Sequence, residues 1–212
     1  MRFSVKKLSF MAVLSAAALV VFIIEAQIPA PVPIPGAKLG LANVITLFAL
    51  FWRRKDADGA SARGNAGEAS SARRKDADGA SALRKEKSAA DSLTATDALL
   101  ILICRIILGA AFSGSAVAFI YSITGGLFAF AAEVALRRFV TNRQIWVCGV
   151  AGAVFHNVGQ ILAAMLITGT PYIAALLPAL TVVAIITGVV TGLVAQFTVA
   201  RLRGVSTPRS TG

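Results

Sequence analysis

The sequence has little charge, few cysteines and a single histidine. Charged residues make up only 15% of its 212 positions, whereas 57% are hydrophobic and the mean hydropathy is +0.76. Soluble domains have roughly 45–50% apolar and about 25% charged residues, so an ordinary soluble globular protein is excluded. The two cysteines, Cys104 and Cys148, lie in separate apolar runs without a CxxC or Cys/His cluster. This pattern is typical of buried thiols and not of a disulfide framework or metal site.

The short motifs of common enzymes are also missing. The chain has no Walker A, HExxH, GxSxG or dinucleotide-binding fingerprint, and its only histidine, His156, has no acidic or nucleophilic neighbour in sequence. Enzymes that elongate prenyl diphosphates need Asp-rich clusters to hold magnesium and diphosphate, and no DDxxD occurs here. The sequence therefore predicts no catalytic residue, no metal ion and no cofactor.

What the chain has instead is a series of long apolar runs. The second and third runs are short, because fifteen residues of helix cover only about 22 Å of a hydrocarbon core about 30 Å thick. The runs lack the strict alternation of a membrane β-barrel, so the fold class is an all-α bundle of six transmembrane helices. The pair Gly188 and Gly192 has the small-xxx-small spacing of close helix packing. The runs lie at residues 8–28, 39–52, 98–112, 116–136, 146–168 and 172–200.

The middle of the chain differs from these runs. The string RRKDADGASA occurs at residues 53–62 and again at 73–82, without a large apolar residue to bury. Such a segment cannot offset its chain entropy, so residues 53–92 are predicted to be a disordered, duplicated cytoplasmic loop. This divides the chain into two membrane helices in residues 1–52, the loop, four membrane helices in residues 93–203, and a cytoplasmic tail at 204–212.

The basic residues are concentrated in four segments between or beyond the apolar runs. The net charge of +11 would suggest nucleic acid in a soluble chain. All basic residues except Lys38 and Arg105 lie before the first run, between the second and third, between the fourth and fifth, or after the last. Lysine and arginine accumulate in cytoplasmic loops, so both termini are predicted to be cytoplasmic. The sequence therefore predicts that this charge orients the protein in a lipid bilayer and does not bind nucleic acid.

Several polar residues interrupt the apolar runs at similar depth. A charged group within a membrane is costly and needs a partner or a role. His156 and Gln160 share a helix face because they are four residues apart. One hypothesis is a ligand pocket near the outer face, in which Lys38 and Arg105 suit an anionic group. The alternative is structural: an ion pair of Glu25 with Arg105 or Lys38, and amides that join helices. The candidate pocket residues are Glu25, Lys38, Asn43, Arg105, His156, Asn157 and Gln160.

Four strings together resemble a known family. They are IPGAKLGLAN at 34–43, RIILG at 105–109, FSGS at 112–115, and HNVGQ at 156–160 followed by GTP at 169–171. They resemble the Gx transporter family, often labelled heptaprenyl diphosphate synthase component I, over about residues 8–52 and 95–203. The duplicated loop departs from the short connection that is usual in this family.

This family is similar to the substrate-binding S components of energy-coupling factor (ECF) transporters for vitamins. The resemblance implies six helices, a pocket near the outer face and no ATPase of its own. It also implies docking, through an AxxxA motif matched here by Ala12 and Ala16, on a transmembrane subunit that carries an ATPase pair.

The resulting hypothesis is a multi-pass plasma-membrane subunit that captures a small molecule for an ECF transporter. The family label implies an alternative, a membrane accessory subunit of heptaprenyl diphosphate synthase in menaquinone and isoprenoid biosynthesis. A third possibility is a purely structural membrane protein within a larger complex.

Overall fold

The computed structural model describes residues 5–27, 40–52 and 93–205, and these residues form helices and short turns. Lys38 and the duplicated segment 53–92 lie outside the described residues, so the predicted disorder of that segment stays a prediction. The helices are α1 (Val5–Ala26), α2 (Asn43–Phe51), α4 (Ala95–Ser113), α5 (Ala116–Leu136), α6 (Ile145–Thr168), the 3-10 helix η1 (Pro171–Leu176) and α7 (Leu177–Val205).

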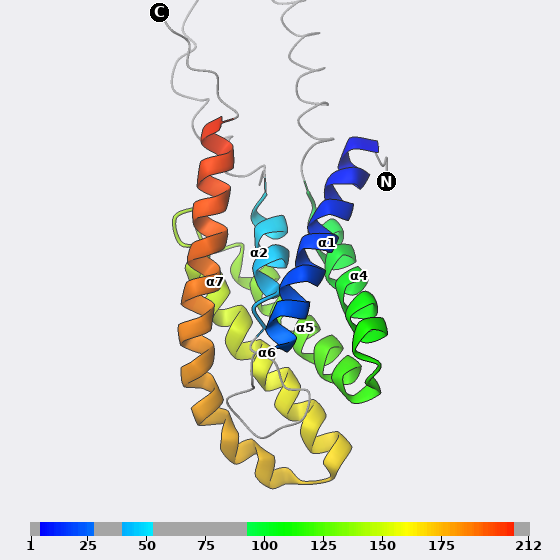
Figure 1. Ribbon diagram of the computed structural model, residues 1–212. Coiled ribbons are helices and arrows are strands. Elements are labelled where there is room, and N and C mark those ends of the chain that lie inside the picture. Colours follow the sequence, from blue (N-terminus) through cyan, green and yellow to red (C-terminus); the bar gives the residue numbers. More distant parts are fainter. Residues whose placement is uncertain (1–4, 28–39, 53–92, 206–212) are drawn as a thin grey trace, which may run out of the picture.

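The helices pack side by side into one bundle, with the start of α1 and the end of α7 at the same end (Figure 1). Helix α6 makes its most extensive contacts with α5 and α7. Five of the helices are long and apolar enough to cross a membrane: α1, α4, α5, α6 and the η1–α7 stretch. The predicted all-α membrane bundle is therefore confirmed, and the protein is a multi-pass membrane protein.

Helix α2 is shorter than the apolar run that predicted it. The run covers residues 39–52, but the helix has nine residues, about 14 Å of helical rise. It begins after a turn at Gly40, whose φ of 77° favours glycine. Although α2 alone cannot cross the bilayer, most of its residues are buried and it contacts each of the other five α-helices. It is the central element of the bundle.

Glycines bring α6 and α7 into close contact. A Cβ atom placed on Gly149 would lie 2.6 Å from the carbonyl oxygen of Gly188, and one on Gly192 would lie 2.5 Å from Cα of Trp146. Backbone atoms cannot move aside as a flexible side chain can, so these positions admit only glycine without a shift of the helices. The packing role predicted for Gly188 and Gly192 is confirmed.

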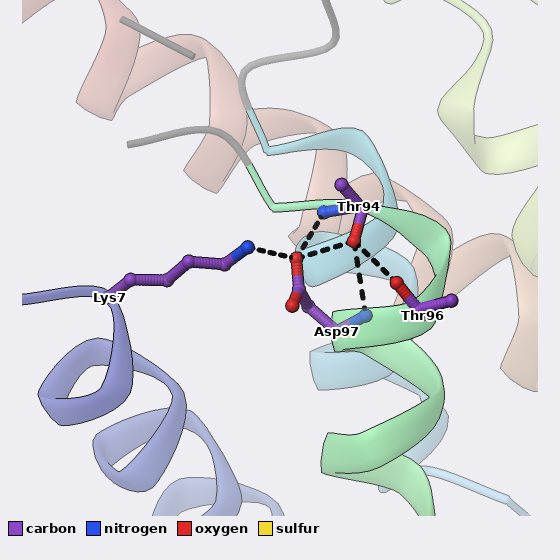
Figure 2. A network of polar contacts seen from close by, with 4 residues as sticks. All are labelled: Lys7, Thr94, Thr96 and Asp97. Atoms are coloured by element: carbon purple, nitrogen blue, oxygen red, sulfur yellow. Dashed lines mark hydrogen bonds and ion pairs between the residues drawn. The ribbon is translucent and has the colours of Figure 1, made fainter. Parts of the chain in front are cut away.

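A polar network joins α1 to the start of α4 (Figure 2). Lys7 Nζ lies 2.6 Å from Asp97 Oδ2, and the same oxygen accepts a 2.6 Å hydrogen bond from the backbone N–H of Thr94. The Thr94 hydroxyl in turn accepts from the N–H of Asp97, which completes a capping box. One carboxylate therefore both caps α4 and holds α1 beside it.

Candidate functional site

The candidate site lies where buried polar side chains of several helices meet near the middle of α6. Gly40 adjoins this point, because a Cβ on Gly40 would lie 3.1 Å from Cδ2 of His156. Six of the seven predicted pocket residues are described, and all six are buried; Lys38 lies outside the described residues. The six are Glu25, Asn43, Arg105, His156, Asn157 and Gln160.

Glu25 links the end of α1 to the start of α2. Its carboxylate accepts hydrogen bonds from the backbone N–H groups of Gly40 at 2.5 Å, Leu41 at 3.2 Å and Ala42 at 3.4 Å. These N–H groups precede the first turn of α2, where a helix favours negative charge. Glu25 therefore acts as a charged cap that arrives from another helix and fixes the two helix ends together.

Arg105 interacts with an amide and with two carboxyl groups. Its Nη2 atom donates a 3.4 Å hydrogen bond to Oδ1 of Asn43, and its guanidinium interacts electrostatically with Glu25 and Glu133. All four residues are buried. The expected association of Glu25 with Arg105 is thus present as an electrostatic interaction, with Asn43 as the directly bonded partner of the guanidinium.

Glu133 belongs to this cluster, although it is not among the seven pocket residues predicted from the sequence. The structure buries Glu133 at 2% exposure and turns it toward α6, where a Cβ on Gly152 would collide with its carboxylate. An acidic residue within an apolar helix is by itself a signal of a site. Gly152, which makes room for this carboxyl group, lies on another helix, so no local sequence pattern predicts that the two residues meet.

The polar residues of α6 point to two different neighbours. His156 and Gln160 lie 3.0 Å apart through His156 Nε2 and Gln160 Nε2, so the predicted shared face is confirmed. Asn157 instead donates from Nδ2 to the carbonyl oxygen of Leu180 at 2.9 Å. It therefore bonds α6 to α7, in the way that the structural alternative expects of an amide.

A small cavity lies at the centre of the cluster. It has a volume of about 10 Å³ and is lined by Phe22, Glu25, Gly40, Arg105, Ser122 and His156. That volume is at the lower end of what one water molecule needs, whereas small-molecule pockets measure roughly 300–1,000 Å³. The site is thus closed in this structure. Ser122 also lines the cavity, although no pattern in the sequence distinguishes it from other serines of the apolar runs.

A larger, apolar groove runs along α1 and α4. Its volume is about 760 Å³, and its lining includes Ala12 and Ala16 of α1 and Leu100 and Leu108 of α4. The two predicted docking residues therefore share one open surface. In the described part of the chain no three His, Cys, Asp or Glu residues are grouped so that they could hold a metal ion.

The family model for heptaprenyl diphosphate synthase component I matches residues 14–57 and 88–198 of the chain. The unmatched stretch between them falls inside the duplicated segment 53–92, in agreement with a long insertion there. Neither the curated proteins nor the solved structures include a significant match. The family match covers well over half of the 212 residues and includes every candidate pocket residue. The chain belongs to the heptaprenyl diphosphate synthase component I family.

Proposed function

We propose that this protein is a plasma-membrane subunit that binds a small molecule from the outer face, similar to the S component of an ECF transporter. The observation that carries the proposal is the buried polar cluster. Side chains of α1, α2, α4, α5 and α6 meet there, and burying them costs free energy that ordinary packing does not require. Intramembrane clusters of this kind mark substrate and ion sites.

Binding requires this site to open. Helix α6 packs extensively on α5 and α7 but only lightly on α2. The bonds from Gly40, Leu41 and Ala42 to Glu25 keep the ends of α1 and α2 together. The proposed movement is therefore a joint displacement of α1 and α2 away from His156. It enlarges the cavity and keeps the α5–α6–α7 contacts, while α2 shifts against α7, the helix it contacts most extensively.

The groove on α1 and α4 supports the second part of the proposed function, which is docking on a transmembrane partner subunit. A transmembrane partner with its ATPase pair needs an apolar surface on which small residues allow close helix approach. Ala12 and Ala16 lie on such a surface, because both are exposed and line the groove. We place the docking of the partner subunit there.

The test of substrate capture begins with mass spectrometry of small molecules that co-purify with the protein, followed by affinity measurements for the molecule found. Arg105→Lys is expected to lower its affinity at least tenfold. Asn157→Ala is the matched control, because that amide bonds Leu180 and not the cavity. Recovery of no bound molecule, or equal affinity in Arg105→Lys, would contradict the proposal.

The family label favours one further candidate, a membrane accessory subunit of heptaprenyl diphosphate synthesis. Reconstitution with a soluble catalytic partner distinguishes the two functions. Formation of heptaprenyl diphosphate that depends on this chain would replace the transporter proposal with the accessory role.

A further inference from the structure

Three buried polar groups, one on a residue that lines the cavity and two on α2, have no hydrogen-bond partner among the described residues. They are Nε of Arg105, Nδ2 of Asn43 and Oγ1 of Thr46. Their residues are exposed by only 3%, 7% and 2%, so bulk water does not reach them freely. A buried donor left without a partner costs about 1–3 kcal/mol, and native proteins rarely tolerate three such groups in one place.

These groups lie together. Asn43 contacts Arg105 through its Oδ1 atom, and Thr46 is three residues further along α2, on the same face as Asn43. Arg105 itself lines the cavity with Glu25, Ser122 and His156. The cavity therefore has several polar walls, which a buried water molecule requires, and its volume of about 10 Å³ admits one such molecule.

The chemistry of Arg105 selects the occupant. Arg105 is the one residue of the three that lines the cavity, and its Nε–H is a donor, so the occupant must offer an acceptor atom. The charges select further, since the Glu25 carboxylate already balances the guanidinium of Arg105, the only arginine or lysine among the described residues that line the cavity. An anion would therefore find no unbalanced positive charge there. The favoured occupant is a neutral acceptor.

We propose that this cavity is a binding site for a neutral hydrogen-bond acceptor, and that one water molecule occupies it in the closed protein. The water accepts the Nε–H bond of Arg105 and donates toward Glu25 or Ser122. On the proposed function, a carbonyl or hydroxyl oxygen of the captured molecule replaces this water. The ligand class is thus a neutral oxygen-bearing group, instead of the anionic group that Lys38 and Arg105 suggest in sequence.

The test is solid-state NMR of the ligand-free, full-length protein in lipid bilayers with ¹⁵N-labelled arginine. The Arg105 Nε resonance is identified by its disappearance in Arg105→Lys. We expect magnetisation transfer from water to the Arg105 Nε–H in the wild-type protein. Ser122→Val places methyl groups in the cavity and should reduce this transfer at least fivefold. Ser113→Val, at the exposed end of α4, should leave it unchanged.

Three results would overturn the inference: an Arg105 resonance without water transfer in the wild-type protein, equal transfer in Ser122→Val, or a shift of the resonance when bromide replaces chloride, which would show a bound anion. Because the experiment uses no ligand, it is independent of the proposed function. Water transfer in a protein that captures no small molecule would refute only substrate capture and leave the water site intact.

Discussion

At the scale of single residues, Glu25 combines two roles that are usually separate. It caps α2 through three backbone N–H groups and supplies negative charge to the buried Arg105. Hydrogen bonds to a charged group are each worth about 1.5–3 kcal/mol, more than bonds between neutral groups. The negative charge of Glu25, and not only the shape of its side chain, therefore stabilises the junction of α1 and α2.

Glu25→Gln keeps the shape and removes the charge. We expect the free energy of unfolding to fall by about 2–3 kcal/mol, because the charged bonds become neutral and Arg105 loses a counter-charge. Denaturant titration in micelles measures this. Glu68→Gln, in the duplicated segment, is the control and should behave like the wild type. A Glu25→Gln protein of unchanged stability would show that the carboxylate is dispensable.

The two amides of α6 should respond differently to truncation. Asn157→Ala removes the bond to Leu180 and should destabilise the protein by about 1–2 kcal/mol, with ligand affinity within twofold of the wild type. Gln160→Ala releases His156, a wall of the cavity, and should weaken ligand binding at least fivefold. Parallel unfolding and binding measurements separate these effects. If both variants lose stability but not affinity, the cluster is structural.

At the scale of elements, the start of α4 depends on one carboxylate. Asp97→Asn removes the charge that binds Lys7 and weakens the capping box with Thr94, so we expect a loss of about 1–2 kcal/mol in thermal unfolding experiments. Lys7→Met removes only the ion pair and should cost less. Equal losses in the two variants would mean that the cap itself contributes nothing.

The contact of α6 with α7 depends on the missing side chain of Gly149. Gly149→Ala should lower the free energy of unfolding by about 1–3 kcal/mol, because its Cβ would meet the Gly188 carbonyl and the two backbones must separate. Val194→Ala, at a position of α7 that is 51% exposed, is the control and should change stability by less than about 0.5 kcal/mol. A stable Gly149→Ala protein would show that the helices separate at no cost.

Element positions were predictable where local signals are strong. Helix α5 covers residues 116–136 as predicted, since Ser115 caps its start and basic residues follow its end. Helix α2 begins later than its apolar run, because Gly40 and the Glu25 carboxylate set its first turn. The place of Glu133 depends on a gap at Gly152 on another helix. The residue spacing within α5 or within α6 does not predict this contact between the two helices.

At the scale of the whole molecule, the arrangement predicts where the chain ends lie. The start of α1 and the end of α7 are at the same end of the bundle (Figure 1), and the basic segments predict that this end faces the cytoplasm. Reporter tags on each terminus should therefore both be inaccessible from outside intact cells. Tags on opposite sides, as five spans without α2 would give, would contradict this topology.

The groove makes a second prediction at this scale. If the proposed partner subunit docks on this groove, Ala12→Leu should fill part of the surface and reduce co-purification of that subunit at least fivefold, while small-molecule binding persists. Val13→Leu is the matched control, because Val13 is an exposed neighbour that does not line the groove. Equal recovery of the partner with both variants would move the interface elsewhere.

The central position of α2 has a consequence for how the protein is made. Synthesis runs from the N-terminus, so α2 leaves the ribosome before α4, α5, α6 and α7, which form most of its surroundings. A nine-residue helix is too short to span the bilayer without neighbouring helices around it. We therefore expect the order of insertion to differ from the order of assembly, with α2 completing its packing only after α7, the helix it contacts most extensively, has entered the membrane.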